Sequence, residues 1–160
     1  MEKIEKIIEN LIEILSERKQ TVSFAESCTG GRIAAAFTAV SGSSAILHGS
    51  CVTYANEIKE QWLGVPKEIL ETKGAVSQEC VEYMLEGMEK MADSNYTLAV
   101  SGIAGPTGGT ELKPVGTVYI GLRTPDGKNE VHYCLFKGDR HQVQDQATSF
   151  AIELLAKNIN

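Results

Sequence analysis

One short segment of the sequence combines a hydroxyl nucleophile with backbone that can surround a ligand. Ser27 lies in the segment Glu26–Gly31, which reads Glu-Ser-Cys-Thr-Gly-Gly and follows a short apolar stretch. If a strand precedes this segment and a helix follows it, Ser27 projects from the edge of a sheet, and N–H groups at the helix start can donate to an anion or a developing oxyanion. Those donors are the N–H groups of Thr29, Gly30 and Gly31. The alternative is that Ser27 and Thr29 merely cap the helix.

A serine nucleophile needs a base, and here lysine is a better candidate than histidine. The histidines are far apart and lie in no obvious active-site motif: His48, His132 and His141. Lysine can act as the base where burial or neighbouring charge lowers its pKa. Lys59 falls in the first turn of a predicted helix with Asn56 as N-cap, where the positive end of the helix disfavours the ammonium form. A single helical lysine is otherwise usually a solvated surface group.

Two other patterns could indicate different chemistry. Cys28 could act as a thiol nucleophile, but it has no evident histidine partner and is better interpreted as a small buried residue. The stretch Ser16–Lys19 matches the SxxK pattern of penicillin-binding enzymes, yet it lies at the charged end of the first predicted helix without the accompanying motifs. We interpret that match as chance.

A glycine-rich loop and a few basic residues could hold a substrate. The segment Ser101–Thr110 follows a predicted strand, at a place where α/β proteins commonly contact ligands. Its alternative interpretation is a glycine-rich turn with no ligand. Lys113, Arg32 and Arg140 are the basic residues nearest these loops in sequence, and one or more could bind a phosphate. The sequence shows no metal-ligand cluster and no cofactor fingerprint, so we expect neither a metal nor a cofactor.

The elements that must position these residues alternate early in the chain and pair late. The predicted strands are 21–25, 50–55, 96–101, 116–123 and 130–136, and the predicted helices are 4–15, 32–40, 56–62, 78–88 and 143–155. Ser77 is a candidate N-cap for the fourth helix, and Pro125-Asp-Gly127 indicates a hairpin between the last two strands. We therefore expect one α/β domain over residues 1–160, a three-layer α/β/α sandwich with a mixed sheet.

Composition limits the class of protein. With 160 residues and 42% hydrophobic content the chain can bury one core, and its formal charge of −6 argues against broad attraction to nucleic acid. The four cysteines are widely spaced with no CxxC pair, as expected for reduced thiols. No stretch approaches the roughly 18 apolar residues of a membrane span, and no signal peptide is evident. We expect a cytoplasmic protein that binds neither nucleic acid nor membrane.

Several segments, taken together and in this order, resemble the nicotinamide-nucleotide amidase family, also described as the C-terminal domain of CinA-type competence- and damage-inducible proteins. Each segment alone is a weak signal, but their combination is specific. The matching segments are 25–31 (AESCTGG), 42–44 (GSS), 52–56 (VTYAN) with Lys59, 63–65 (LGV), 74–77 (GAVS), 102–106 (GIAGP) with the glycines at 108–109, and 113–118 (KPVGTV).

The resemblance implies a three-layer α/β/α fold, assembly as a homodimer or larger homo-oligomer, and hydrolysis of nicotinamide mononucleotide to nicotinic acid mononucleotide and ammonia in pyridine nucleotide recycling. In the family, the serine of ESCTGG is the nucleophile, and the tyrosine and lysine of YxNxxK complete the catalytic group. Here these are Ser27, Tyr54 and Lys59, so the resemblance implies a phenol between the serine and the lysine that takes part in moving the serine proton. The expected substrate-binding residues are Thr29, Gly30, Gly31, Ser43, Ser44, Gly102, Ala104, Gly105 and Arg140.

The chain departs from the family pattern at a few positions. Ser41, Ser50 and Ser101 replace the usual proline, glycine and threonine, which are mild changes. Gln144 is a larger one, because the family commonly has arginine there, which carries a charge and a bidentate donor. Either a phosphate contact or a brace at a subunit contact would be lost. A second hypothesis is therefore a catalytically weak nucleotide-binding or competence- and damage-related protein, and a third is an amidase for another pyridine nucleotide.

Overall fold

A five-stranded mixed sheet organises the chain. The computed structural model describes residues 2–159. Its helices are α1 (Glu2–Arg18), α2 (Arg32–Thr38), α3 (Asn56–Leu63), α4 (Lys67–Thr72), α5 (Gln78–Ala92) and α6 (Arg140–Lys157), with a short 3₁₀ turn, η1 (Ser43–Ala45). Its strands are β1 (Val22–Glu26), β2 (Leu47–Val52), β3 (Tyr96–Gly102), β4 (Thr117–Arg123) and β5 (Asn129–Leu135).

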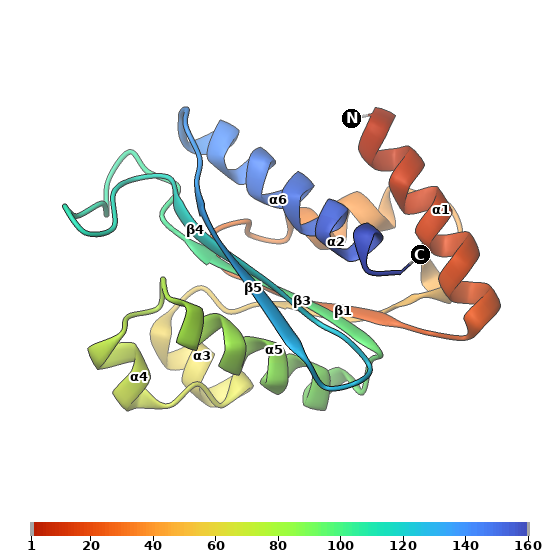
Figure 1. Ribbon diagram of the computed structural model, residues 1–160, viewed down its shortest axis with the longest axis horizontal. Helices are drawn as coiled ribbons and strands as arrows, with labels where there is room; N and C mark the ends of the chain where they lie inside the picture. Colours follow the sequence, from red (N-terminus) through yellow and green to blue (C-terminus); the bar gives the residue numbers. More distant parts are fainter. Residues whose placement is uncertain (1, 160) are drawn as a thin grey trace.

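The sheet carries helices on both faces. The strand order is β2-β1-β3-β4-β5, in which β1 runs parallel to β2 and β3 while β4 and β5 continue the sheet antiparallel. Helices α1, α2 and α6 lie on one face, and α3, α4 and α5 lie on the other (Figure 1). The prediction of a single three-layer α/β/α domain with a mixed sheet is confirmed. Within residues 2–159, no helix is long and apolar enough to cross a membrane.

The predicted elements are present, with differences at their ends. Strand β2 lies earlier in the chain than predicted, because the backbone leaves the sheet before α3 begins. Asn56 is the first residue of α3 and not its N-cap, since the capping position is Ala55 and no side chain caps this helix. Ser77 is confirmed as the N-cap of α5. Helix α4 was not predicted, because its six residues are too few to show helical periodicity.

The connections around β1 create a crevice at one edge of the sheet. From β1 the chain passes through α2 to β2 on one side, whereas from β3 it continues to β4 on the other. The carboxyl ends of β1 and β3 therefore lie side by side while their outgoing connections separate. In open α/β sheets, ligands bind outside the strand ends at such a switch point.

Register determines which side chains face the α3–α5 layer at that edge. Ala25 of β1 pairs with Ala99 of β3, and both belong to the apolar core under α3 and α5. Because side chains alternate along a strand, positions two residues further on point to the same layer. Those positions are Ser27 and Ser101, so the fold directs two hydroxyl groups toward the same helices.

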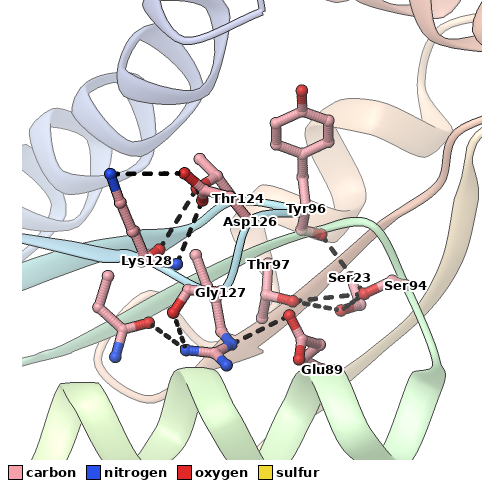
Figure 2. A network of polar contacts seen from close by, with 11 residues as sticks. Ser23, Glu89, Ser94, Tyr96, Thr97, Thr124, Asp126, Gly127 and Lys128 are labelled. Carbon is pink, nitrogen blue, oxygen red and sulfur yellow. Dashed lines mark hydrogen bonds and ion pairs between the residues drawn. The ribbon is translucent and has the colours of Figure 1, made fainter.

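A polar network closes the opposite end of the sheet (Figure 2). The hydroxyls of Ser23, Ser94 and Thr97 are buried and hydrogen-bond to one another, which satisfies them without water. Nearby, Arg123 Nε donates to Glu89 Oε2 at 3.0 Å and so ties β4 to α5. These contacts hold the sheet against its helices away from the crevice.

Gly87 allows α5 to pack closely against the end of α3. A Cβ atom on Gly87 would lie 2.0 Å from the backbone oxygen of Leu63. No side chain fits at that distance, so the two helices could accept alanine only by moving apart. Helix α3 carries Lys59, which makes this contact relevant to the site described below.

We expect Gly87→Ala to destabilise the protein by about 1–3 kcal/mol, because overpacking outweighs the roughly 1 kcal/mol that alanine gains over glycine in a helix. Urea unfolding followed by circular dichroism measures the change. Glu86→Ala, on an exposed position of the same helix, is the matched control and should be near neutral. A Gly87→Ala protein as stable as wild type would contradict the close packing.

Candidate active site

A small cleft opens at the crevice between the ends of β1 and β3. Its volume is about 190 Å³, below the roughly 300–1,000 Å³ of typical ligand pockets, so it encloses only part of a nucleotide-sized molecule. The lining residues come from the turn after β1, the start of α3, the loop before α5, the end of β3 and the start of α6. They are Ser27, Cys28, Tyr54, Asn56, Lys59, Ala75, Val76, Ser101, Gly102, Ala104 and Arg140.

Ser27 and Lys59 are in direct contact at the base of this cleft. Lys59 Nζ donates to Ser27 Oγ at 3.0 Å, and the two side chains come from different elements that the sheet brings together. The lysine is only 1% exposed, which is rare for this residue type unless it is paired. Ser27 is 7% exposed and remains open to the cleft. The structure thus joins the two residues that sequence reasoning singled out separately.

The surroundings of Lys59 suit a neutral amine. Two backbone carbonyls accept from Nζ, that of Thr53 at 2.7 Å and that of Tyr54 at 3.0 Å. A neutral amine has two hydrogens and one lone pair. With both hydrogens directed at the carbonyls, the lone pair faces Ser27 Oγ and can accept its hydrogen. The same three contacts suit the ammonium after a proton transfer, when the third hydrogen points back at the serine.

Burial lowers the pKa of Lys59 below its ordinary value of 10.5, because the ammonium loses its hydration inside the protein. Negative charge on the neighbouring cysteines would oppose this effect. Burial, however, raises the pKa of the Cys28 thiol to about 12 and that of Cys80 to about 11, so both stay protonated near neutral pH. The main cause is therefore burial, and not the helix dipole expected from the sequence. The raised pKa of Cys28 also removes it as a nucleophile.

Glu26 holds the turn that presents Ser27. Its fully buried carboxylate accepts from the Thr29 hydroxyl at 2.6 Å and from the N–H groups of Gly31, Ile33 and Ala34 at 3.2, 3.0 and 3.0 Å. A single side chain thereby caps α2 and closes the loop between β1 and that helix. Sequence reasoning missed this role; its signal was an acidic residue just before a helix start.

This cap changes which backbone donors can meet an oxyanion. The Gly31 N–H is occupied by Glu26, and the Gly30 N–H donates to the carbonyl of Ser27. The expectation that both glycine N–H groups face a ligand is therefore wrong. Within residues 2–159, the N–H groups of Cys28 and Thr29 have no hydrogen-bond acceptor, so the donors near Ser27 are these two.

Replacing Glu26 with glutamine should disturb the nucleophile without touching the substrate. The amide would place an NH₂ group against an N–H donor, so we expect a loss of about 1–3 kcal/mol of stability. We also expect lower kcat with a smaller change in KM, because the turn carrying Ser27 loosens. Chemical unfolding and steady-state kinetics measure both. Glu17→Gln, on an exposed position of α1, is the control, and equal behaviour of the two variants would contradict the role of Glu26.

Tyr54 lies at the mouth of the cleft, not between the serine and the lysine. It is 61% exposed, and its hydroxyl accepts from Arg140 at 3.1 Å. Only its backbone carbonyl contacts Lys59. Arg140 also donates to the carbonyl of Gly105 at 2.7 Å. Apart from Lys59, Arg140 is the only cationic side chain that lines the cleft among the described residues.

Gln144 lies beneath the nucleophile turn, outside the cleft lining. It is 6% exposed, and its amide donates to the carbonyl of Cys28 at 3.0 Å. This position matches neither alternative considered from the sequence, since the side chain is enclosed by its own chain and braces the turn from behind. The presence of glutamine at position 144 therefore does not support the hypothesis of a protein that binds nucleotides without hydrolysing them.

The remaining predicted site residues divide into two groups. Gly102 and Ala104 line the cleft, and Gly105 contributes the carbonyl that holds Arg140. Ser43 and Ser44 belong to η1, which precedes β2 at the end of the sheet away from the cleft, and within this chain they do not reach it. Among residues 2–159, no group of three or more acidic, histidine or cysteine side chains could hold a metal ion.

The cleft also includes residues that sequence reasoning did not assign. Asn56, Ala75 and Val76 line it from the α3–α5 side. The first was expected as a helix cap, and the other two lie in a loop with no chemical side chain, so nothing in their type indicated a site.

Comparison with known proteins places the chain in a family. The model of the CinA C-terminal domain matches residues 4–159. A CinA-like protein from Fervidobacterium nodosum is 49% identical over 92% of this chain, and one from Thermotoga neapolitana is 42% identical over 97%. The chain spans only 36% and 38% of the length of these two curated relatives.

Solved structures agree with the sequence matches. A competence/damage-inducible protein from Agrobacterium tumefaciens aligns with a TM-score of 0.94 and 37% identity, covering 96% of this chain and 94% of that one. A CinA superfamily protein from Escherichia coli aligns with a TM-score of 0.91 and 32% identity, covering 96% and 90%.

Proposed function

The chain belongs to the CinA C-terminal domain family, and from that premise we propose that it is a serine amidohydrolase that deamidates nicotinamide mononucleotide. The observation that carries the proposal is the buried contact of 3.0 Å between Lys59 Nζ and Ser27 Oγ. A buried lysine with a lowered pKa beside a serine open to a cleft is the arrangement that an activated serine requires.

The reaction would proceed in two steps. Ser27 Oγ attacks the carboxamide carbon while Lys59 Nζ accepts the hydroxyl proton, and the N–H groups of Cys28 and Thr29 donate to the oxyanion. The C–N bond then breaks, and the nitrogen takes the proton from Lys59 and leaves as ammonia. Water, deprotonated by the same amine, attacks the acyl-serine. The bond from the acyl carbon to Ser27 Oγ then breaks, Lys59 returns the proton to Ser27 Oγ, and the nicotinic acid product leaves. Each step returns Lys59 to its neutral form.

The rim of the cleft supports an anionic pyridine nucleotide as substrate. The cleft has room for an aromatic amide but not for a whole nucleotide, so the ribose phosphate would lie at the mouth. Arg140 lies there, and a guanidinium is well suited to bind phosphate. Tyr54 would act at this rim by holding Arg140 and the substrate, in place of the proton-handling role expected from the resemblance.

The experiment is ammonia release by the purified protein, in the presence of a chelator, from nicotinamide mononucleotide, nicotinamide riboside and nicotinamide. We expect the mononucleotide to be favoured by about 10- to 100-fold in kcat/KM, the gain from a charged hydrogen bond. Preference for the riboside or for free nicotinamide would keep the amidase chemistry and change the substrate. Nucleotide binding without turnover would favour the nucleotide-binding alternative.

A further inference from the structure

A second buried hydroxyl lies beside the nucleophile. Ser101 is 2% exposed and lines the cleft, and the structure shows no hydrogen bond from its hydroxyl to another residue among 2–159. The Oγ atom is not among the fully enclosed polar atoms that lack a partner, so it is open to the cleft. A hydroxyl that faces a cleft without a partner inside the protein can bind a ligand there, as either donor or acceptor.

The sheet places this hydroxyl in register with Ser27. Glu26 pairs with Val100, and the next residue of each chain is Ser27 and Ser101. The Ser27 N–H donates to the carbonyl of Val100 at 3.0 Å, which continues the β1–β3 pairing past the end of β1. Adjacent strands lie about 4.8 Å apart, so the two hydroxyls stand side by side and face the same helices.

The two sides of Ser27 then differ in the hydrogen bonds that they can offer a substrate. On one side, Lys59 Nζ contacts Ser27 Oγ, and the unoccupied N–H groups of Cys28 and Thr29 can only donate, which suits the carbonyl oxygen of an amide. On the β3 side, Ser101 Oγ can accept as well as donate. An amide whose oxygen points to the turn after β1 directs its nitrogen away from that turn, toward β3.

We propose that Ser101 Oγ accepts a hydrogen bond from the N–H of the reacting carboxamide and thereby favours carboxamides over esters. The proposal rests on the proposed function and adds a specificity residue to it. The contact orients the amide for attack at its carbon and satisfies an N–H group that would otherwise be buried without an acceptor. Threonine at this position would retain the hydroxyl, whereas alanine would not.

Two substrates, one with and one without an N–H group at the reacting centre, test the proposal. Wild type, Ser101→Ala and Ser101→Thr are assayed with nicotinamide mononucleotide and with the methyl ester of nicotinic acid mononucleotide, which has no N–H at the reacting centre. We expect Ser101→Ala to lose about tenfold or more in kcat/KM for the amide and to change little for the ester. Ser101→Thr should retain amide hydrolysis within a few-fold.

The outcomes separate the inference from the proposed function. Equal losses of Ser101→Ala on both substrates would overturn the inference, since they would mean a structural role or a contact to the carbonyl oxygen. No loss on either would overturn it as well. A folded wild-type protein that turned over neither compound would instead overturn the proposed function, and the inference with it.

Discussion

Replacing Ser27 with alanine is expected to lower kcat for ammonia release by about 10⁴-fold or more. The reason is that Ser27 Oγ forms the bond to substrate and no other described group can take its place. Cys28 is adjacent, but burial raises the pKa of its thiol to about 12, and so it stays protonated. Substrate binding should persist, because Arg140 and the rim of the cleft are unchanged.

Ammonia release at saturating substrate, with isothermal titration to measure binding, checks this expectation. Ser41→Ala, in an exposed turn away from the cleft, is the matched control and should keep full activity. A mass increase on the peptide containing Ser27 in quenched wild-type reactions would identify the acyl intermediate. Turnover unaffected in Ser27→Ala would sink the serine mechanism.

Lys59→Met should abolish turnover to a similar extent, since methionine fills the space but accepts no proton. The pH dependence of wild type should report the same group. Because burial lowers the pKa of Lys59 below 10.5, kcat/KM should rise with pH through that lowered pKa and then level off. Lys90→Met, at an exposed position of α5, should leave both the rate and its pH dependence unchanged.

Lys59→Met also tests how the free energy of unfolding depends on pH. A lysine whose pKa is lower in the folded state is more protonated in the unfolded state at pH values between the two pKa values. Wild-type stability therefore rises with pH across that window, by at most about 1.4 kcal/mol per pH unit from this residue, up to the unfolded value near 10.5. Lys59→Met lacks this contribution, so urea unfolding should show wild type gaining stability relative to the variant as pH rises. Parallel curves would show that Lys59 keeps an ordinary pKa.

The sequence was most informative where periodicity and a distinctive motif coincided. Alternating strands and helices were enough to predict the layers, and the glycine-containing turn was enough to single out Ser27. From the residues alone, Lys59 could be proposed only because the histidines were unsuitable and because it falls in the first turn of a predicted helix. Its pairing with Ser27 depends on the order in which β1 and β2 lie in the sheet, which local patterns do not encode.

What could not be predicted depends on contacts between distant segments. Glu26 was assigned no role, because its carboxylate reaches backbone N–H groups on the far side of a turn, and the path of that turn depends on contacts that local patterns do not encode. Gln144 was considered only for phosphate or subunit contacts, and its bond to Cys28 joins positions 116 residues apart. The resemblance implied that Tyr54 lies between Ser27 and Lys59, whereas in the structure its hydroxyl hydrogen-bonds to Arg140.

Helix α6 links the two ends of the site mechanically. Arg140 and Gln144 are four residues apart on it and share a face. Through them one rigid element contacts both the rim, at Gly105, and the carbonyl of Cys28 behind the nucleophile. A ligand that shifts the start of α6 therefore also shifts the turn carrying Ser27. The effects of substitutions at the two positions would then be thermodynamically coupled and non-additive. Binding of a phosphate group at Arg140 would in turn change the reactivity of Ser27.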